Sequence, residues 1–264
     1  MDTFRSLHAA GQFLILPNAW DAGSARIIES SGASAIATSS AAVAWAQGYP
    51  DGNALPPEIL TRTIEAITRV IGIPLSVDSE GGYSNDAAQA GENILAFVNA
   101  GAVGINIEDG SESPDLMCAK IEAAKRAGEK AGVNLFVNAR IDVLLKQLTP
   151  PEQAIEETLA RAARYRDAGC DGIFVPMLTR EHEIEAVVRG IDPLPLNVMC
   201  VANLPPASEL RRLGVRRLSA GASIAKAAIS LTRQLATEFL ADGDSAAVYR
   251  HVTDKTDINA LFRR

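Results

Sequence analysis

The chain has 264 residues, of which 47% are hydrophobic and 22% charged, and its formal net charge is −7. These values are ordinary for a globular protein with a full core, and a single domain of this length is typical of α/β barrels. The acidic balance without a basic run argues against nucleic acid as a partner, and no segment has the ~20 apolar residues of a membrane helix.

Short apolar runs recur along the chain, separated by segments with helical patterning. They lack polar alternation, which is typical of parallel strands that are covered on both faces. The eight predicted strands are Phe13–Leu16, Ala35–Thr38, Pro74–Val77, Val103–Ile107, Leu135–Val137, Gly172–Val175, Leu196–Met199 and Arg216–Leu218.

The segments between these runs predict helices. Leu60, Ile64 and Ile67 fall on one helical face, and the stretch Thr149-Pro150-Pro151-Glu152 is typical of a capped helix start. Eight β-then-α units predict a single (β/α)₈ TIM barrel over residues 1–264, in which residues 220–264 form a C-terminal helical region. A doubly wound open sheet is the alternative, but no Gly-rich fingerprint follows the first strand.

Acidic residues follow two neighbouring predicted strands, at the ends where barrel enzymes hold their active sites. Asp78 and Glu80 come after the third strand, and Glu108 and Asp109 come after the fourth. Four carboxylates in one place repel one another and need a compensating cation, and oxygen ligands suit Mg²⁺ or Mn²⁺. The alternative is that they cap helices or form ion pairs.

Arg140 follows the fifth predicted strand and is suited to clamp a substrate carboxylate with two hydrogen bonds. Together with a metal ion it would stabilise an enolate. The alternative is a structural ion pair between Arg140 and Asp142 or Glu108. The three histidines lie away from the strand ends, so we expect structural roles for them.

From Leu16 to about Ser223 the sequence resembles the isocitrate lyase/phosphoenolpyruvate mutase superfamily. The order of several strand-end motifs carries the resemblance. They are Pro17-Asn18-Ala19-Trp20-Asp21, Thr38-Ser39-Ser40, Gly48-Tyr49-Pro50-Asp51, Val77-Asp78-Ser79-Glu80-Gly81-Gly82-Tyr83, Asn106-Ile107-Glu108-Asp109 and Asn138-Ala139-Arg140-Ile141-Asp142.

The resemblance implies a Mg²⁺-dependent barrel that acts on 2-oxo or 2-hydroxy acids through enolates. It implies that Asp78 binds the metal directly, that Glu80 and Glu108 hold it largely through water, and that Asp109 supports them. The implied catalytic residues are Arg140, Asp51 and Glu108. The implied substrate contacts are Trp20, Ser39, Ser40, Ala41, Asp78, Arg140 and Asn197, with Ala41 standing where the family has glycine.

The loop after the fourth predicted strand departs from the family's pattern. Glu108-Asp109 is followed by Gly110-Ser111-Glu112-Ser113, without the Lys-Lys/Arg-Cys-Gly-His motif of the lyases or the Lys and Asn of the phosphonate enzymes. Cys118 lies nearby without such neighbours. The proton donor is therefore unassigned, and an oxo-acid-binding protein with little turnover is the alternative function. A barrel with a phosphate site at Gly221–Ser223 is a third interpretation.

The expected partners are a small carboxylate substrate and further copies of the chain. In the resembled family the eighth helix is exchanged between subunits, which implies a homodimer or homotetramer built on Ala220–Ala241. Three widely spaced cysteines and the lack of a visible signal peptide lead us to expect a cytoplasmic protein.

Overall fold

The protein is described from a computed structural model that covers residues 3–253 and 256–263. Nine short parallel strands form one sheet in the order β1-β9-β8-β7-β6-β5-β4-β3-β2. The strands are β1 (Leu14–Leu16), β2 (Asn18–Ala19), β3 (Ile36–Thr38), β4 (Leu75–Asp78), β5 (Gly104–Glu108), β6 (Phe136–Arg140), β7 (Gly172–Phe174), β8 (Leu196–Met199) and β9 (Arg217–Ser219).

The sheet closes on itself through its first two strands. β1 and β2 are consecutive and are separated only by Pro17, which has no N–H to contribute to a ladder. Leu14 in β1 pairs with Arg217 in β9, and Asn18 in β2 pairs with Ala37 in β3. The nine segments are therefore the eight strands of a closed barrel, which confirms the predicted TIM fold and excludes the open sheet.

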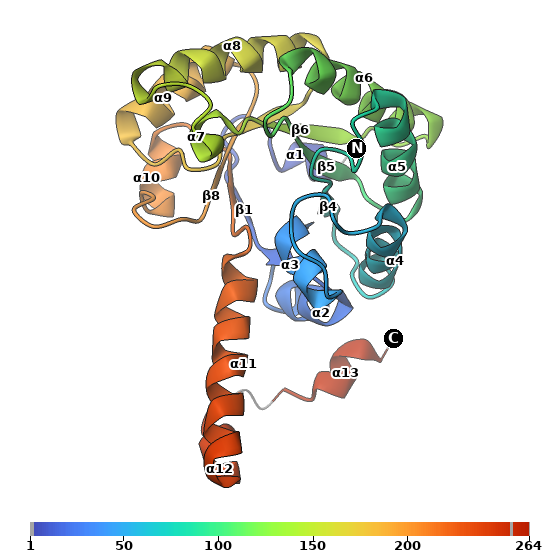
Figure 1. Cartoon of the computed structure of the whole chain (residues 1–264), viewed down its shortest axis with the longest axis vertical. Coiled ribbons are helices and arrows are strands. Elements are labelled where there is room, and N and C mark those ends of the chain that lie inside the picture. Colours follow the sequence, from blue (N-terminus) through green and yellow to red (C-terminus); the bar gives the residue numbers. More distant parts are fainter. Residues whose placement is uncertain (1–2, 254–255, 264) are drawn as a thin grey trace.

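Helices follow the strands and surround the barrel (Figure 1). They are α1 (Thr3–Ser6), α2 (Ala22–Ser30), α3 (Ser40–Ala46), α4 (Pro57–Thr68), α5 (Ala87–Asn99), α6 (Pro114–Lys130), α7 (Val143–Lys146), η1 (Pro151–Gln153), α8 (Ala154–Asp167), α9 (Glu181–Ile191), α10 (Ala207–Arg212), α11 (Ser223–Asp242), α12 (Ser245–Tyr249) and α13 (Ile258–Phe262).

One predicted helix start is wrong in detail. Pro150 is extended, with φ −54° and ψ 144°, and Pro151–Gln153 is a 3₁₀ turn that leads into α8 at Ala154. A residue that precedes proline is driven out of the α region, so Thr149 and Pro150 cannot open an α-helix together. Neither end of this turn has a side-chain cap, in contrast to α2, which Asp21 caps through the backbone N of Ser24.

The last long helix departs from the barrel. α11 extends outward from the rim, and the chain then turns back so that α13 contacts α2 (Figure 1). Arg26 in α2 donates from Nε to the carbonyl oxygen of Leu261 at 2.6 Å. Among the described residues, no helix combines the length and apolar character that crossing a membrane requires.

Candidate metal and carboxylate site

A cavity of about 520 Å³ lies at the carboxyl ends of the strands. Parallel strands bring their last residues to this end of a barrel, so residues far apart in sequence meet there. The cavity wall includes six of the residues predicted from the sequence, which are Ser39, Ser40, Ala41, Asp51, Asp78 and Arg140.

Asp78 ends β4 and presents one unsatisfied carboxylate oxygen. Its Oδ2 accepts a hydrogen bond from the backbone N of Ser40 at 3.0 Å, and its own backbone N donates to Oγ1 of Thr38 at 2.8 Å. Its Oδ1 is buried and has no hydrogen-bond partner among the residues that the structure describes. A buried acceptor without a partner is unfavourable, so Asp78 is suited to bind a cation directly.

Glu80 and Glu108 are the second and third carboxylates of the group. Glu80 is buried, and its backbone adopts the left-handed conformation with φ 46°. Its Oε2 accepts a hydrogen bond from the backbone N of Asn53, and its Oε1 has no hydrogen-bond partner among the described residues. Burial raises the pKa of Glu80 to about 7, although the hydrogen bond from Asn53 opposes this. Burial also raises the pKa of Glu108 to about 8, although Arg140 opposes it.

These acidic groups fit a magnesium ion that retains water. The donor set consists of carboxylate oxygens, which Mg²⁺ and Mn²⁺ prefer. Within residues 3–253 and 256–263, no three His, Cys, Asp or Glu side chains come close enough to hold an ion together. Mg²⁺ is usually bound by one or two carboxylates and keeps several waters, so Asp78 would hold it directly and Glu80 and Glu108 through water.

Asp109 has a different environment from the other three carboxylates. Its side chain is fully buried, and its Oδ2 accepts from Nη1 of Arg161 at 2.8 Å and from the hydroxyl of Tyr165 at 2.7 Å. Its Oδ1 accepts from the backbone N of Asp142 at 2.9 Å. Both oxygens are already hydrogen-bonded, so we leave Asp109 out of the proposed metal ligands.

Arg140 ends β6 at the cavity wall and is held from two sides. Its Nε and Nη2 donate to the two carboxylate oxygens of Asp142 at 2.7 and 3.0 Å, and its Nη1 forms an ion pair with Glu108. Burial works against its charge, but Glu108 and Asp142 together keep the pKa of Arg140 above its ordinary value. The predicted structural ion pairs are therefore present, and they fix the guanidinium in the wall.

Two predicted substrate contacts lie outside the cavity wall. Trp20 packs partly buried against the core, and its backbone N donates to Oγ of Ser24 at 3.0 Å. Asn197 is buried in the barrel interior, where its Oδ1 accepts from Nδ2 of Asn138 at 3.1 Å. Neither side chain contributes to the wall.

Sequence reasoning gave no role to several residues of the wall, among them the polar residues Asn106, Ser219 and Lys226. The first was detectable, because successive strand residues face opposite sides and Asn106 stands two positions before Glu108. Ser219 is the last residue of β9. Lys226 lies one turn inside α11, and no local pattern marks it.

Cys118 lies outside the cavity wall. It lies in α6, where its Sγ is 3.7 Å from the carbonyl oxygen of Arg164. Burial raises the pKa of the Cys118 thiol, whereas nucleophilic cysteines have a lowered pKa. In the described part of the chain, the loop 110–113 before α6 adds no residue to the cavity wall.

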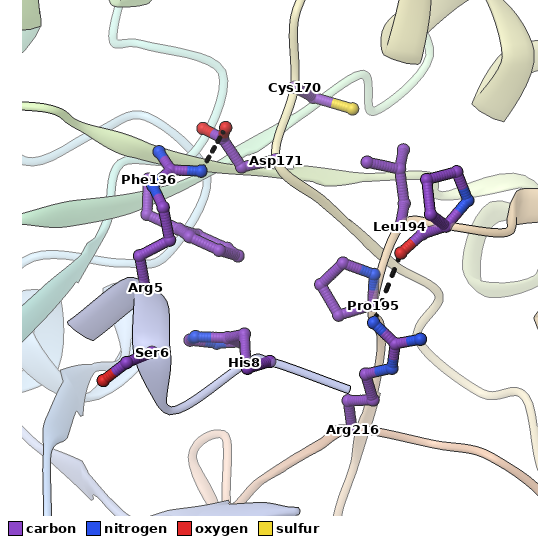
Figure 2. Close-up of a pocket in the computed structure, with 11 residues that line it drawn as sticks. Arg5, Ser6, His8, Phe136, Cys170, Asp171, Leu194, Pro195 and Arg216 are labelled. Carbon is purple, nitrogen blue, oxygen red and sulfur yellow. Dashed lines mark hydrogen bonds and ion pairs between the residues drawn. The ribbon is translucent and has the colours of Figure 1, made fainter. Parts of the chain in front are cut away.

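A second cavity, of about 510 Å³, lies at the opposite, amino ends of the strands (Figure 2). In its wall Arg5 forms an ion pair with Asp171 at 2.7 Å, and the ring of His8 stacks on Phe136 with 4.2 Å between centroids. The Nδ1–H of His8 donates to the carbonyl oxygen of Phe4 at 3.0 Å. Burial lowers the pKa of His8 to about 3, so the ring is neutral at neutral pH.

Comparison with known proteins agrees with this geometry. The sequence pattern of the phosphoenolpyruvate phosphomutase family matches residues 4–240. One similar structure is that of a Burkholderia cenocepacia J2315 protein that is provisionally named a phosphonomutase. It is 42% identical to this chain and superimposes with a TM-score of 0.84, and the match covers 89% of this chain and 97% of the other. An uncharacterized Mycobacterium tuberculosis (strain ATCC 25618 / H37Rv) protein, Rv1998c, is 37% identical over 83% of this chain and 81% of its own length.

A relative with a named activity is more distant. The oxaloacetate decarboxylase of Pseudomonas entomophila (strain L48) is 27% identical over 87% of this chain and 81% of its own length. The family pattern spans nearly the whole barrel and includes every strand-end residue discussed above. The chain therefore belongs to the phosphoenolpyruvate phosphomutase family, within the phosphoenolpyruvate mutase/isocitrate lyase superfamily.

Proposed function

We propose that this protein is a Mg²⁺- or Mn²⁺-dependent carbon–carbon lyase or decarboxylase. Its substrate is a small 2-oxo or 2-hydroxy carboxylic acid, and the reaction passes through an enolate. The observation that supports this most directly is the buried, unpartnered Oδ1 of Asp78 beside a cavity of about 520 Å³. That volume lies within the range of small-molecule sites.

The chain's own residues would bind and orient the substrate. When bound, the metal ion would supply positive charge that stabilises negative charge on the oxygens of the acid. Ser40 and Ala41, in the first turn of α3, lie beside Asp78 and are suited to hold the substrate carboxylate. Arg140 adds a fixed positive charge at the wall, and Asp51 lines the entrance loop.

The bond change is the same for either reaction of a 2-oxo acid. In a 2-oxo acid the carbonyl carbon is C2, and the bond that breaks joins C3 to C4. The electron pair of that bond becomes part of the enolate. In a decarboxylation the leaving group is CO₂, and a proton then adds to the enolate carbon. A fixed cationic environment at the developing oxyanion lowers the barrier of this step.

Asp78→Ala tests the metal role. We expect oxalate, a chelating mimic of the enolate, to bind the wild type only with Mg²⁺, and the variant to lose at least about a hundredfold in affinity, since even outer-shell ligand changes give 10–100-fold losses. Isothermal titration calorimetry measures this, and circular dichroism checks folding. Asp167→Ala, at an exposed carboxylate, is the matched control. Equal affinity in wild type and Asp78→Ala would remove the metal role.

A second candidate function is oxo-acid binding with little or no turnover. The short loop 110–113 and the position of Cys118 favour it, because neither supplies a proton donor. Product release from oxaloacetate and other 2-oxo acids, followed with Mg²⁺ present, separates the two functions. Oxalate binding without any product from these acids would support the binding function instead.

We also propose that the protein is a homodimer or homotetramer built on α11. This helix extends from the barrel (Figure 1). It exposes large apolar side chains, with Leu240 84% and Phe239 49% accessible. Contiguous exposed apolar surface usually marks an interaction site. Copies of this chain are the partner that the proposal names.

A further inference from the structure

A single cation, Arg217, is buried inside the barrel. It lies on β9, is 1% exposed, and is the largest fully buried side chain in the described chain. It forms no ion pair with any acidic group of residues 3–253 and 256–263, and its Nε and Nη1 have no hydrogen-bond partner there. An unpaired buried charge is unfavourable, so its presence needs a reason.

Within the described part of the chain, the side chain of Arg217 makes one hydrogen bond, and this bond crosses the barrel. Its Nη2 donates to Oδ1 of Asn106 on β5 at 3.1 Å. Burial lowers the pKa of Arg217 to about 9, with Asp78 opposing the shift, so the group is still a cation at neutral pH. A guanidinium has donors and no acceptor, and the atom of Asn106 that faces it must therefore be the amide oxygen.

This contact stands at one end of a row of hydrogen-bonded amides. Oδ1 of Asn106 also accepts from Nδ2 of Asn138 at 2.8 Å, and that Nδ2 donates in turn to Oδ1 of Asn197 at 3.1 Å. Nδ2 of Asn197 then donates to Oγ of Ser219 at 3.1 Å. Nδ2 of Asn197 also donates to the carbonyl oxygen of Val198 at 2.6 Å. The cation at one end of the row and a backbone carbonyl at the other therefore favour the same direction for its hydrogen bonds.

The row leaves one donor for the cavity. Oδ1 of Asn106 already accepts from Asn138 and from Arg217, so the other end of the amide, Nδ2, is left to make a further contact. That Nδ2 donates to no residue in the described part of the chain, and Asn106 lines the cavity. Asn106 is also the register partner of Asp78 on the neighbouring strand. An N–H group thus faces the cavity next to the proposed metal ligand.

We propose that the side-chain N–H of Asn106 donates a hydrogen bond to an oxygen of the bound 2-oxo acid, and that Arg217 is the positioning residue that holds this amide. The inference rests on the proposed function, because it names a further substrate contact of the same site. A donor that is already oriented before the ligand binds contributes more to the binding free energy than one that must reorient, because no further entropy is lost in ordering it.

The surrounding residues are shaped for the row. Gly172 on β7 faces Asn138, and a Cβ at this position would lie 3.0 Å from Oδ1 of Asn138 and 3.3 Å from the ring of Phe136. A larger residue would displace the amide. At this level the barrel interior therefore holds a polar row in place of the apolar layer that usually fills a barrel.

Stability separates a positioning role from a structural one. Replacing a buried, unpaired charge by an apolar group of similar volume is often neutral or stabilising. If Arg217 serves the site, Arg217→Met will keep or raise the melting temperature and still weaken ligand binding, because the Asn106 amide then loses one of the two donors that hold its Oδ1. If Arg217 serves the fold alone, the melting temperature will fall and oxalate affinity will be unchanged.

The experiment compares Asn106→Ala, Arg217→Met and Arg217→Lys with the wild type by calorimetry, using oxalate at saturating Mg²⁺. We expect about tenfold weaker oxalate binding in Asn106→Ala, as for one lost hydrogen bond to a charged group. We expect a smaller loss of several-fold in Arg217→Met and partial recovery in Arg217→Lys. Ser76→Ala, which alters a buried hydroxyl without a described partner, is the control and should bind normally.

Binding of Mn²⁺ alone, followed by electron paramagnetic resonance, keeps the two proposals apart. Unchanged Mn²⁺ affinity with weaker oxalate binding in Asn106→Ala supports the inference. Wild-type oxalate affinity in that variant overturns the inference and leaves the proposed function standing. A wild type that binds neither Mn²⁺ nor oxalate overturns both. If Arg217→Met does not fold, Asn106→Ala still decides.

Discussion

Two largely buried carboxyl groups near Asp78 hold their protons to unusually high pH. Burial raises the pKa of Glu80 to about 7 and that of Glu108 to about 8, from ordinary values of 4.5. A raised pKa in the folded state means that the folded protein binds more protons than the unfolded chain between these values. Without a cation, the site is therefore more stable when protonated.

The melting temperature of the metal-free protein should accordingly fall as pH rises from 5 to 9. The contribution of both groups is fully present below about pH 4.5, the unfolded pKa, and is lost as pH passes through 7 and 8. Mg²⁺ should remove much of the fall, because it stabilises the charged carboxylates. Differential scanning fluorimetry with and without Mg²⁺ measures this, and Glu108→Gln should flatten the slope. An identical slope in that variant would contradict the assignment.

At the scale of elements, Asp109 joins two strand ends to a helix. It follows β5, accepts from the backbone of Asp142 after β6, and bonds Arg161 and Tyr165 of α8. The sequence alone predicted a metal-supporting carboxylate here. The helix that comes 45 residues later in the chain supplies the partners of Asp109, and only the fold brings that helix to the strand ends.

Asp109→Ala should therefore destabilise the protein strongly, by about 3 kcal/mol, because it leaves a partly buried Arg161 and a buried Tyr165 hydroxyl without this acceptor. Urea denaturation gives the free energy of unfolding. Asp115→Ala removes an ion pair whose aspartate is 85% exposed, and should change stability by less than about 1 kcal/mol. Similar losses in the two variants would show that Asp109 does not join these elements.

At the scale of the whole molecule, α11 is the element that the barrel does not explain. Its 20 residues include only one buried residue, Ala225, and its apolar side chains face outward. A helix with so little burial gains little stability from its own chain, because most helical stability comes from packing. This is the physical basis for placing the subunit contact there.

Phe239→Glu combined with Leu240→Glu should reduce the oligomer to a smaller species. Each added charge would have to be desolvated in the contact, which is unfavourable when it is unpaired. Multi-angle light scattering after gel filtration gives the mass. Gln234→Glu, a polar and exposed position on the same helix, should leave the mass unchanged. A wild type that runs as a monomer would refute the proposed contact.

The sequence by itself determined the order of strands and helices, and with it the barrel. Local apolar runs and turn residues specify each unit, and a parallel strand-helix alternation has few ways to close. It also determined the motif residues at the strand ends, so that Ser40, Asp51, Asp78 and Arg140 were found at the cavity wall. The positions of Ser40, Asp78 and Arg140 follow from the chain's local periodicity and the rule that barrel sites lie at carboxyl ends, whereas Asp51 was implied by the resemblance to the family.

Only the tertiary structure decided which polar groups are free and which are satisfied. Asp78 and Asp109 look alike in sequence, yet one has an unpartnered buried oxygen and the other is fully hydrogen-bonded. Arg217 and Asn106 are 111 positions apart, and nothing local marks them as partners. Hydrogen bonding and desolvation depend on neighbours from distant strands, so these roles appear only once the barrel has closed.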